Sequence, residues 1–556
     1  MSIRITSDQW WKNAVIYCLD IETYLDWNGD GMGDVGGLME RVDYLAGIGV
    51  TCIWLMPYFP TPDRDDGYDV TDFYGVDPRL GTLGEFVVLV RTARDRGIRV
   101  IVDLVVNHTS DRHPWFRSAR SSRSSPYRDW YVWVDEPPDD ASLTETFPGE
   151  QGGVWTYDEK AGQYYLHRFY EHQPDLNIAH PEVREEIARI MGFWLELGVS
   201  GFRVDAVPFL LELDGVEDAP SVDPHTYLKD MRSFVQRRQG EAILLGEVNL
   251  PPKQQREFFG DEGGDELNLV FNFSVMQRIY LALARGEAEP VEQALADLPP
   301  VPFDSQWATF LRNHDELTLD QLSDAERDEV FAAFGPDPDM QLYDRGLRRR
   351  LPPMLGGDGD RIRMAYSLLF SLPGTPVLFY GEEIGMGENL AAPDRLAVRT
   401  PMQWSDEAGA GFSPADPSTF PTPVTEGEYG PLAVNVTQQR RDAGSLLNWF
   451  ERLVRRRRET PELGLGAWSV IATPEPAVLA HRCDWDGSTV VAVHNFSAEP
   501  CRLDVPLDGV DDAVGAVELL DGVPETELDE PVLHLELAGY GYRWFRVRRE
   551  GQRRTP

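Results

Sequence analysis

The chain has few cysteines, little positive charge and no long apolar segment. Four cysteines in 556 residues exclude a disulfide-stapled scaffold of the kind that small secreted proteins use. No run approaches the roughly 18 apolar residues that a membrane helix needs, and residues 1–20 lack a basic stretch followed by an apolar one. We therefore expect a cytoplasmic protein with no membrane association and no disulfide framework.

Positive charge is scarce as well. Lys and Arg number 52 against 93 Asp and Glu, which gives a formal net charge of −41. A surface of this sign repels nucleic acid and anionic lipid, so neither is an expected partner. Hydrophobic residues nevertheless make up 42% of the chain, which is ordinary for a globular protein with a large core.

What the chain does contain is a series of short apolar runs separated by amphipathic segments. Continuous apolar runs of this length are typical of parallel strands covered on both faces. Eight such runs predict an α/β fold, a (β/α)8 TIM barrel. An open doubly wound sheet is disfavoured because no glycine-rich dinucleotide fingerprint follows the first run. The runs are residues 14–19, 51–56, 100–106, 201–207, 242–248, 267–273, 308–311 and 376–380.

Two regions differ from this pattern. Residues 109–172 are rich in Ser, Arg, Pro, Trp and Tyr and are too long for a loop, so we expect an inserted subdomain after the third strand. The tail alternates apolar and polar residues between turn signals, which predicts a C-terminal antiparallel β-sandwich with strands near 477–483, 489–495, 532–537 and 542–547. The predicted domains are a catalytic barrel of residues 1–108 and 173–462, an inserted subdomain of residues 109–172 and a sandwich of residues 463–556.

Ionisable side chains lie at the ends of several predicted strands, where a barrel places its catalytic groups. Arg203 and Asp205 are two residues apart, so on a strand they point the same way, and the guanidinium favours the ionised carboxylate that a nucleophile needs. Glu247 follows five small or apolar residues, a setting that raises its pKa and keeps its proton available. One ionised and one protonated carboxylate are what a retaining glycosidase requires. A structural ion pair is the alternative for each group taken singly.

A loop of oxygen-bearing residues follows the first predicted strand. Its pattern D-x-N-x-D-G-x-G-D resembles the first part of an EF-hand loop, in which the side chains of Asp26, Asn28, Asp30 and Asp34 and the carbonyl of Met32 are ligands. The glutamate of the twelfth position is absent, because a glycine stands there. We expect a structural Ca²⁺ ion, with Mg²⁺ as the alternative ion and a metal-free acidic turn as the alternative structure.

Taken together, these segments resemble the α-amylase family, glycoside hydrolase family 13. The motif regions stand in the family's order as residues 103–108 (DLVVNH), 173–177 (QPDLN), 201–205 (GFRVD), 247–248 (EV) and 313–315 (NHD). The resemblance implies that Asp205 is the nucleophile, that Glu247 is the acid/base, and that Asp315 grips ring hydroxyls and stabilises the oxocarbenium-like state. It therefore implies a sugar as the substrate.

The resemblance also implies a set of residues around the bound glucose. Asp65 and Tyr68 are expected to close the subsite of the terminal glucose through a hydrogen bond and stacking, and Arg399 is expected near the acceptor. For each histidine or aromatic residue taken singly, a structural role in the core is the alternative. The implied substrate-binding residues are Asp65, Tyr68, His108, Phe169, Gln173, Arg203, His314 and Arg399.

Within the family, the chain resembles the branch that interconverts maltose and trehalose, and this resemblance extends almost to the end of the chain. It includes residues 111–116 (DRHPWF), 313–319 (NHDELTL), 347–353 (LRRRLPP) and 445–449 (SLLNW). That branch has a second calcium site, so the resemblance implies one here. Its ligands are counterparts of the side chains of Asn107, Asp175 and Glu212 and of the backbone carbonyls of Phe209 and Leu210.

The chain departs from that branch at three places. Glu22 stands where an arginine is usual, residues 248–252 read VNLPP in place of ANQWP, and residues 390–396 read LAAPDRL where YLGDRN is usual. The last two are expected near the acceptor pocket, where the released glucose must be held before it attacks again.

The leading expectation is glucosyl transfer between maltose and trehalose through a covalent glucosyl–Asp205 intermediate. Two alternatives are kept. One is hydrolysis, as an α-glucosidase or a trehalose-hydrolysing enzyme, and the other is a non-catalytic barrel that serves as a binding module. A small oligosaccharide or disaccharide is the expected partner, and assembly into a homo-oligomer is left open.

Overall fold

The centre of the molecule is a closed barrel of eight parallel strands. The computed structural model describes residues 9–138, 146–147, 151–211, 225–520, 522 and 526–552. Neighbouring strands pair in the order β1-β2-β3-β7-β8-β9-β10-β14, and β14 closes on β1. Every predicted run overlaps one of these strands, so the TIM-barrel prediction is confirmed. The strands are β1 (Ile16–Leu19), β2 (Cys52–Leu55), β3 (Arg99–Leu104), β7 (Gly201–Val204), β8 (Ile243–Gly246), β9 (Leu269–Phe271), β10 (Gln306–Thr309) and β14 (Thr375–Phe379).

Helices surround the barrel and bury one face against it. In α1 (Val35–Ile48) the buried residues Leu38, Val42 and Leu45 recur at helical spacing, and the Asp34 side chain caps the first turn by accepting from the Gly37 N–H. In α2 (Leu83–Asp95) Thr82 and Glu85 form a capping box. The other helices around the barrel are α4 (Pro181–Glu196), α5 (Val207–Leu211), α6 (His225–Arg238), α7 (Pro252–Gln255), α8 (Phe273–Arg285), α9 (Glu289–Asp297), α11 (Leu351–Met354), α12 (Gly359–Ser371), α13 (Val436–Arg441), α14 (Leu446–Arg458) and α15 (Glu462–Leu465).

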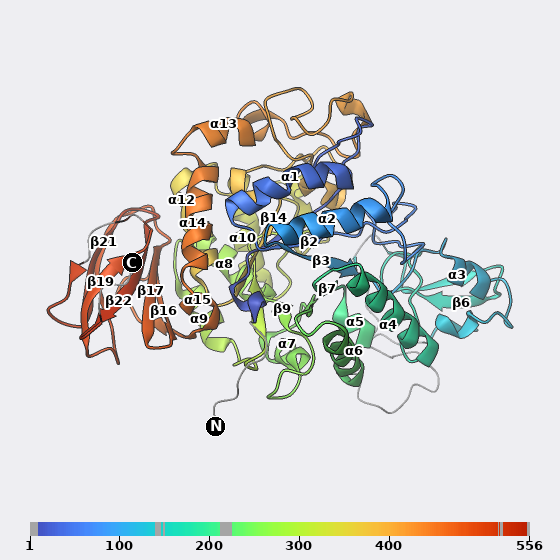
Figure 1. Cartoon of the computed structure of the whole chain (residues 1–556), viewed down its shortest axis with the longest axis horizontal. Coiled ribbons are helices and arrows are strands. Elements are labelled where there is room, and N and C mark those ends of the chain that lie inside the picture. Colours follow the sequence, from blue (N-terminus) through green and yellow to red (C-terminus); the bar gives the residue numbers. More distant parts are fainter. Residues whose placement is uncertain are drawn as a thin grey trace.

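Short elements fill the segment between β3 and α4, where the sequence predicts an inserted subdomain. They are α3 (Pro114–Ala119) and a three-stranded antiparallel sheet of β4 (Trp133–Val134), β6 (Gln163–Leu166) and β5 (Trp155–Asp158). A β-bridge between His108 and Asp175 ties the two ends of the segment together at the barrel rim. In Figure 1 this segment lies at the end of the molecule opposite the C-terminal strands.

A second insertion follows β10 and was not predicted. It contains a small antiparallel sheet of β11 (Leu317–Thr318), β13 (Gly346–Leu347) and β12 (Gln341–Leu342), together with α10 (Asp324–Phe334). The turn between β12 and β13 carries two consecutive non-glycine residues with left-handed backbone, Tyr343 at φ 56° and Asp344 at φ 52°. Such conformations cost about 1–3 kcal/mol each and persist only where surrounding contacts enforce them.

The C-terminal region consists of two antiparallel sheets. The larger has the strand order β15-β16-β17-β22-β19-β20, and the smaller pairs β18 with β21. Buried Val491, Val493, Leu503 and Leu533 belong to one apolar cluster that includes residues of both sheets. The four predicted strands are β16, β17, β21 and β22. The strands are β15 (Ala467–Ile471), β16 (Val478–Trp485), β17 (Ser488–Asn495), β18 (Cys501–Pro506), β19 (Ala513–Glu518), β20 (Thr526–Glu527), β21 (Val532–Leu537) and β22 (Tyr542–Arg549).

The four cysteines, Cys18, Cys52, Cys483 and Cys501, are all free thiols. Among the described residues, no helix is both long enough and apolar enough to cross a bilayer.

Candidate active site

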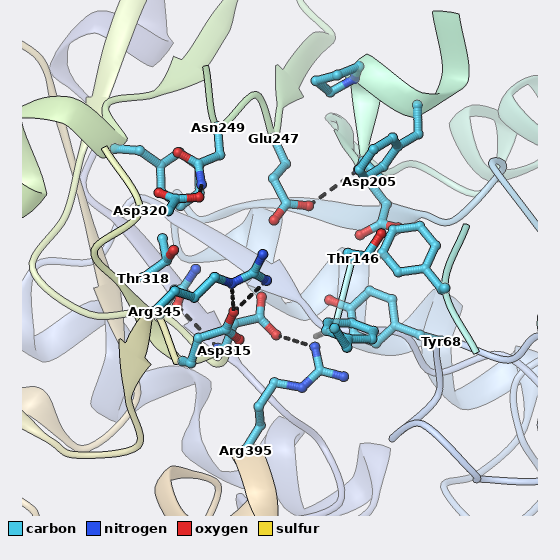
Figure 2. A pocket seen from close by; sticks show the side chains of 18 of the residues that line it. Tyr68, Thr146, Asp205, Glu247, Asn249, Asp315, Thr318, Asp320, Arg345 and Arg395 are labelled. Carbon is cyan, nitrogen blue, oxygen red and sulfur yellow. Dashed lines mark hydrogen bonds and ion pairs between the residues drawn. The ribbon is translucent and has the colours of Figure 1, made fainter. Parts of the chain in front are cut away.

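A cavity with an empty volume of about 1120 Å³ opens at the carboxyl ends of the barrel strands. Its walls include residues from several strand ends, from the inserted segment 109–172 and from the second insertion. Figure 2 shows Glu247 and Asp205 on one side of this cavity and Arg395 entering from the other. Of the predicted site residues, those that line it are Asp65, Tyr68, His108, Phe169, Phe209, Asp205, Glu247 and Asp315.

One buried arginine holds the two proposed catalytic carboxylates together. Arg203, at the end of β7, places Nη1 at 2.6 Å from Asp205 Oδ1 and at 2.8 Å from Asp103 Oδ1. Its Nη2 lies 2.6 Å from Glu247 Oε2. Because Asp205 and Glu247 touch the two terminal nitrogens of one guanidinium, they face a single gap, as the two carboxyl groups of a retaining glycosidase must.

Burial dominates the proton affinity of both carboxyl groups. It raises the pKa of Asp205 to about 6, an effect that Arg203 opposes and Asp103 reinforces. It raises the pKa of Glu247 to about 7, again opposed by Arg203 and reinforced by Asp205. The sequence argument expected the guanidinium to decide the state of Asp205, whereas desolvation is the larger effect. The expected order of the two pKa values nevertheless holds, because Asp205 loses its proton at a lower pH than Glu247 does.

A strained residue follows the proposed nucleophile. Ala206 has φ 48°, a left-handed conformation that is rare for a residue with a side chain. This turn directs the Ala206 N–H to Glu247 Oε2, at 3.2 Å, and lets Val207 N donate to the Glu247 carbonyl at 3.2 Å. The strained turn therefore fixes the end of β7 against Glu247, the residue that follows β8.

Asp315 lies in a cluster of positive charge just beyond β10. Its Oδ1 accepts from Arg395 Nη1 at 2.8 Å and from Arg399 Nη2 at 3.1 Å, and His314 Nε2 lies 3.2 Å from its Oδ2. Burial would raise the pKa of Asp315, but these neighbours outweigh it and hold the pKa far below its usual range. Asp315 is therefore a permanent anion, suited to stabilise positive charge on a sugar ring.

Asp65 and Tyr68 are held rigidly at the far end of the cavity. Asp65 Oδ1 accepts from Arg395 Nη2 at 2.6 Å, and Asp65 Oδ2 accepts from Gln173 Nε2 at 2.9 Å. Tyr68 stacks on His314 with ring planes 4° apart and shares a 2.7 Å hydrogen bond with its Nε2. A ring face and an acceptor are thus presented together, as the predicted stacking and hydrogen bond require.

The remaining predicted residues pack against the side chains described above. His108 is buried and its Nε2 contacts the Tyr68 carbonyl at 3.1 Å, while burial lowers its pKa to about 4, so the ring is neutral. Arg399 bonds the His314 carbonyl at 2.8 Å and pairs with Asp66 and Asp315. Phe169 packs against His108, with ring centroids 5.0 Å apart, at the cavity wall.

Several cavity residues were absent from the predicted set. Arg395 binds both Asp65 and Asp315, and the only sequence signal for it was the unusual segment 390–396. Asn249, two residues after Glu247, donates to Asp320 at 2.8 Å, and Arg345 pairs with Glu316 at 2.9 Å. Figure 2 places Asn249, Thr318 and Asp320 together, on the side of the cavity away from Tyr68. Arg345 comes from the second insertion, whose short strands no sequence pattern predicted.

The acidic loop before α1 has the oxygen donors that Ca²⁺ prefers. Asp26 accepts from the N–H groups of Gly29 at 2.7 Å and Gly31 at 2.8 Å, and Asp30 accepts from Met32 N at 2.9 Å. Asn28 accepts from Asp30 N, and Asp34 accepts from Asn28 N. The five expected ligands therefore share one tightly turned loop, and an all-oxygen donor set fits a hard cation.

The expected second calcium set is described only in part. Asn107 donates to Asp175 at 3.3 Å, and the Arg168 guanidinium lies 3.7 Å from the same carboxylate. Phe209 and Leu210 lie in α5, and their N–H groups donate to the Ala206 carbonyl. Glu212 lies outside the described residues.

A further acidic group lies beside the cavity. Within the described part of the chain, one group of three acidic side chains has oxygens that all lie within 4.8 Å of one another, namely Glu22, Asp63 and Asp66. Arg79 pairs with Glu22 at 3.2 Å and with Asp63 at 2.6 Å, so the group is partly neutralised by an arginine. The unusual Glu22 is thus an ion-pair partner of Arg79.

The barrel and its site define an enzyme that acts on α-glucosidic bonds. A family model for the alpha amylase catalytic domain matches residues 21–329 and 348–466, and one for the C-terminal domain of sucrose hydrolase-like proteins matches residues 487–546. The chain therefore belongs to the α-amylase family and is an α-glucosyl-transferring enzyme, which confirms the resemblance.

Two curated relatives match nearly the whole chain. It is 42% identical over 544 residues to the trehalose synthase/amylase TreS of Mycobacterium tuberculosis, covering 97% of this chain and 90% of that protein. It is 41% identical over 553 residues to the trehalose synthase of Pimelobacter sp., covering 97% and 96%. Among solved structures, the trehalulose synthase MutB of Pseudomonas mesoacidophila MX-45 superposes with a TM-score of 0.77 at 29% identity, over 97% of this chain and 99% of that one.

Proposed function

We propose that the protein is a trehalose synthase that converts maltose and trehalose into one another within one active site. The observation that carries the proposal is the pair Asp205 and Glu247 on one guanidinium, in a cavity closed beyond the terminal glucose by Arg395 with Asp65. Trehalose synthases that resemble the chain over nearly its full length support the choice of substrate.

The geometry suggests how the reaction proceeds. Asp205 attacks the anomeric carbon of the terminal glucose, the bond from that carbon to O4 of the second glucose breaks, and Glu247 gives its proton to the departing O4. A glucosyl–Asp205 ester and free glucose result. The freed glucose then turns and attacks with its 1-hydroxyl, Glu247 takes up that proton, and Asp205 leaves as a carboxylate. General acid/base help of this kind is worth about 10²–10⁴ in rate.

Hydrolysis is the competing outcome, because water can attack the same ester. Asn249, Asp320 and Arg345 form a polar wall on the side of the cavity where the freed glucose turns, and they support transfer. The apolar residues Leu250 and Phe273 line the same cavity, and Leu250 belongs to the segment 248–252, in which the sequence departs from the branch. Hydrolysis as an α-glucosidase therefore remains the second candidate function.

Product analysis distinguishes the two functions. Purified protein incubated with maltose, and separately with trehalose, is expected to give the other disaccharide as the main product, with glucose as a minor one, by anion-exchange chromatography. Asp205→Asn is the matched control and is expected to form neither. Glucose as the only product from both sugars would contradict the transferase and support the hydrolase.

We also propose that Ca²⁺ binds the loop of Asp26, Asn28, Asp30, Met32 and Asp34, with Mg²⁺ as the alternative ion, and that a second Ca²⁺ uses Asn107, Asp175, Glu212 and the carbonyls of Phe209 and Leu210. When bound, the first of these ions would supply positive charge that links the loop after β1 to the start of α1.

The free thiols support a cytoplasmic protein, and the net charge of −41 supports a small sugar, and no nucleic acid, as its partner.

A further inference from the structure

Five polar side chains from three separate segments form one hydrogen-bonded network at the wall of the active-site cavity. Ser274 and Gln277 lie in the first turns of α8, Asn249 follows β8, and Asp320 and Gln321 follow β11. None of them belongs to the segment inserted after β3. Asn249 and Asp320 line the cavity, where Figure 2 shows them together, whereas the other three do not line it. We call these five residues the amide network.

The amide network converges on the carboxylate of Asp320. Asn249 Nδ2 donates to Asp320 Oδ2 at 2.8 Å, and Gln277 Nε2 donates to Asp320 Oδ1 at 3.0 Å. Each carboxylate oxygen thus has an amide donor from a different segment, which fixes the plane of the group. An ionised carboxylate has about four lone-pair sites, so two amides do not exhaust it. Since Asp320 is exposed on the cavity wall, it can also accept hydrogen bonds from hydroxyls inside the cavity.

Gln277 is itself held at both ends of its amide. Its Nε2 donates to Asp320, and its Oε1 accepts from the Gln321 N–H at 2.9 Å. Gln277 is only 1% exposed, so rotation of its amide would leave buried polar groups without partners. The side chain therefore has one orientation, in which its donor faces Asp320.

Gln321 joins the two amides that hold Asp320. Besides the bond from its N–H to Gln277, it donates through Nε2 to Asn249 Oδ1 at 2.6 Å, and its Oε1 accepts from Ser274 Oγ. Ser274 and Gln277 are three residues apart in α8, so they share one face of that helix. A helix of the barrel thus sets the position of a carboxylate that lies beyond β11.

We propose that Gln277 is a positioning residue for sugar binding, which holds Asp320 in the orientation that accepts hydroxyls of the second glucose of maltose. The proposal rests on the proposed function, because it takes maltose as the substrate. It deepens that function by naming a residue outside the cavity on which recognition of the second glucose depends. An aromatic leaving group without hydroxyls does not use this contact, so only substrates with a second sugar depend on Gln277.

Gln277→Met tests the proposal, because methionine is unbranched and flexible but offers no amide. Gln277→Glu is the second variant, since it keeps an oxygen for the Gln321 N–H and replaces the donor to Asp320 by a carboxylate. Gln293→Met is the matched control, because Gln293 is an exposed glutamine of α9 that donates to Asp297 at 3.0 Å. For each protein, kcat/KM is measured for maltose and for phenyl α-glucoside, together with the products formed from maltose and Tm.

In Gln277→Met, kcat/KM for maltose is expected to fall about tenfold, the size of one hydrogen bond to a charged group. For phenyl α-glucoside it is expected to stay within about twofold of wild type. The ratio of free glucose to trehalose is expected to rise, because the freed glucose uses the same contact. Gln277→Glu is expected to change the maltose value in the same direction, and Gln293→Met to leave all three values unchanged.

A double-mutant cycle shows whether Gln277 acts through Asp320. Asp320→Ala alone is expected to lower kcat/KM for maltose and to spare phenyl α-glucoside. Adding Gln277→Met to Asp320→Ala is expected to cause no further loss, since the group that Gln277 positions is already gone. A purely structural role would lower both substrates and would do so again in the Asp320→Ala background.

The outcomes separate this proposal from the proposed function. Equal losses for the two substrates in Gln277→Met, or a full further loss in the double variant, would overturn the role of Gln277 and leave the function standing. Wild-type protein that releases only glucose from maltose would overturn the transferase, whereas the comparison of maltose with phenyl α-glucoside would still decide the role of Gln277. If Gln277→Met does not fold, Gln277→Glu decides, and a wild-type kcat/KM for maltose in that variant overturns the proposal.

Discussion

At the scale of single residues, the charge on Arg203 is shared by Asp103, Asp205 and Glu247, and the backbone N–H of Ala206 adds a further donor to Glu247. The consequence is a pair of carboxyl groups whose proton affinities differ in the order that the reaction needs. Asp205 must be ionised to attack, and Glu247 must be protonated to release the leaving group.

This arrangement predicts the pH dependence of turnover. The rate constant kcat/KM is expected to rise with pH as Asp205 loses its proton near pH 6 and to fall as Glu247 loses its proton near pH 7. Glu247→Gln is expected to lower kcat/KM by about 10²–10⁴ and to abolish the falling limb, since glutamine does not titrate. Steady-state rates between pH 5 and 9 measure both. A falling limb that survives in Glu247→Gln at the same pH would show that another group supplies it.

Much of this constellation could be predicted from sequence. Asp205, Glu247 and Asp315 each lie beyond the end of a barrel strand that an apolar run predicts, and the ends of parallel strands meet at one rim. Arg395 escaped prediction because it follows no strand run, and only folding brings it within 2.6 Å of Asp65, which is 330 positions earlier. Its partners are set by the tertiary fold, which local patterns do not record.

At the scale of an element, the loop from Asp26 to Asp34 joins β1 to α1 and depends on its carboxylates. Gly31 has φ 100°, and a Cβ there would meet the side chain of Thr419 at 2.5 Å, so the turn leaves room only for glycine. The loop also holds segment 413–419 in place, since Ser413 donates to Asp26 at 2.6 Å.

Metal removal tests the proposed ion in this loop. Ca²⁺ bound only by the folded protein stabilises it by mass action, so prolonged EDTA treatment and buffer exchange are expected to lower Tm, and added Ca²⁺ to restore it. Differential scanning calorimetry measures the shift. Asp30→Ala is expected to lower Tm and to lose the part of the EDTA effect that the ion in this loop contributes, whereas Asp339→Ala, on the surface of the second insertion, is expected to keep the whole effect. An unchanged Tm after verified metal removal would count against both proposed ions.

Elements differed in how well the sequence predicted them. The eight barrel strands are continuous apolar runs, which leave a clear signal. The strands β11, β12 and β13 have two residues each, too few to show a period, so the second insertion went unpredicted. In the C-terminal region β15, β18, β19 and β20 were missed, although β18 alternates exposed and buried residues.

At the scale of the whole molecule, the fold buries carboxyl groups that favour the protonated state. Burial raises the pKa of Glu382, after β14, to about 8, although Phe379 N and the Tyr366 hydroxyl donate to it. The folded protein therefore keeps a proton that the unfolded chain loses near pH 4.5, and stability falls as the pH rises between these values. The slope for one such group is about 1.4 kcal/mol per pH unit.

Glu382→Gln is expected to remove that slope. The Tm of Glu382→Gln minus the Tm of wild type should increase from pH 5 to pH 8. Only the wild type has a buried carboxyl group at this position, which must either ionise or retain its proton as the pH rises. Thermal unfolding followed by circular dichroism at several pH values measures this difference. Glu428→Gln, at an exposed position, is the control and should track wild type throughout. Parallel Tm curves for Glu382→Gln and wild type would contradict the prediction.

The ion pairs of Arg395 with Asp65 and Asp315 have a consequence for the length of sugar that the enzyme can use. We expect these ion pairs to block the cavity beyond the glucose ring that occupies the site. No further sugar unit can then extend past the non-reducing end of that ring. A glucan of any length enters only by its tip, and a bond in the middle of a polymer stays out of reach. We therefore expect these three side chains to restrict the enzyme to chain ends and to the smallest sugars.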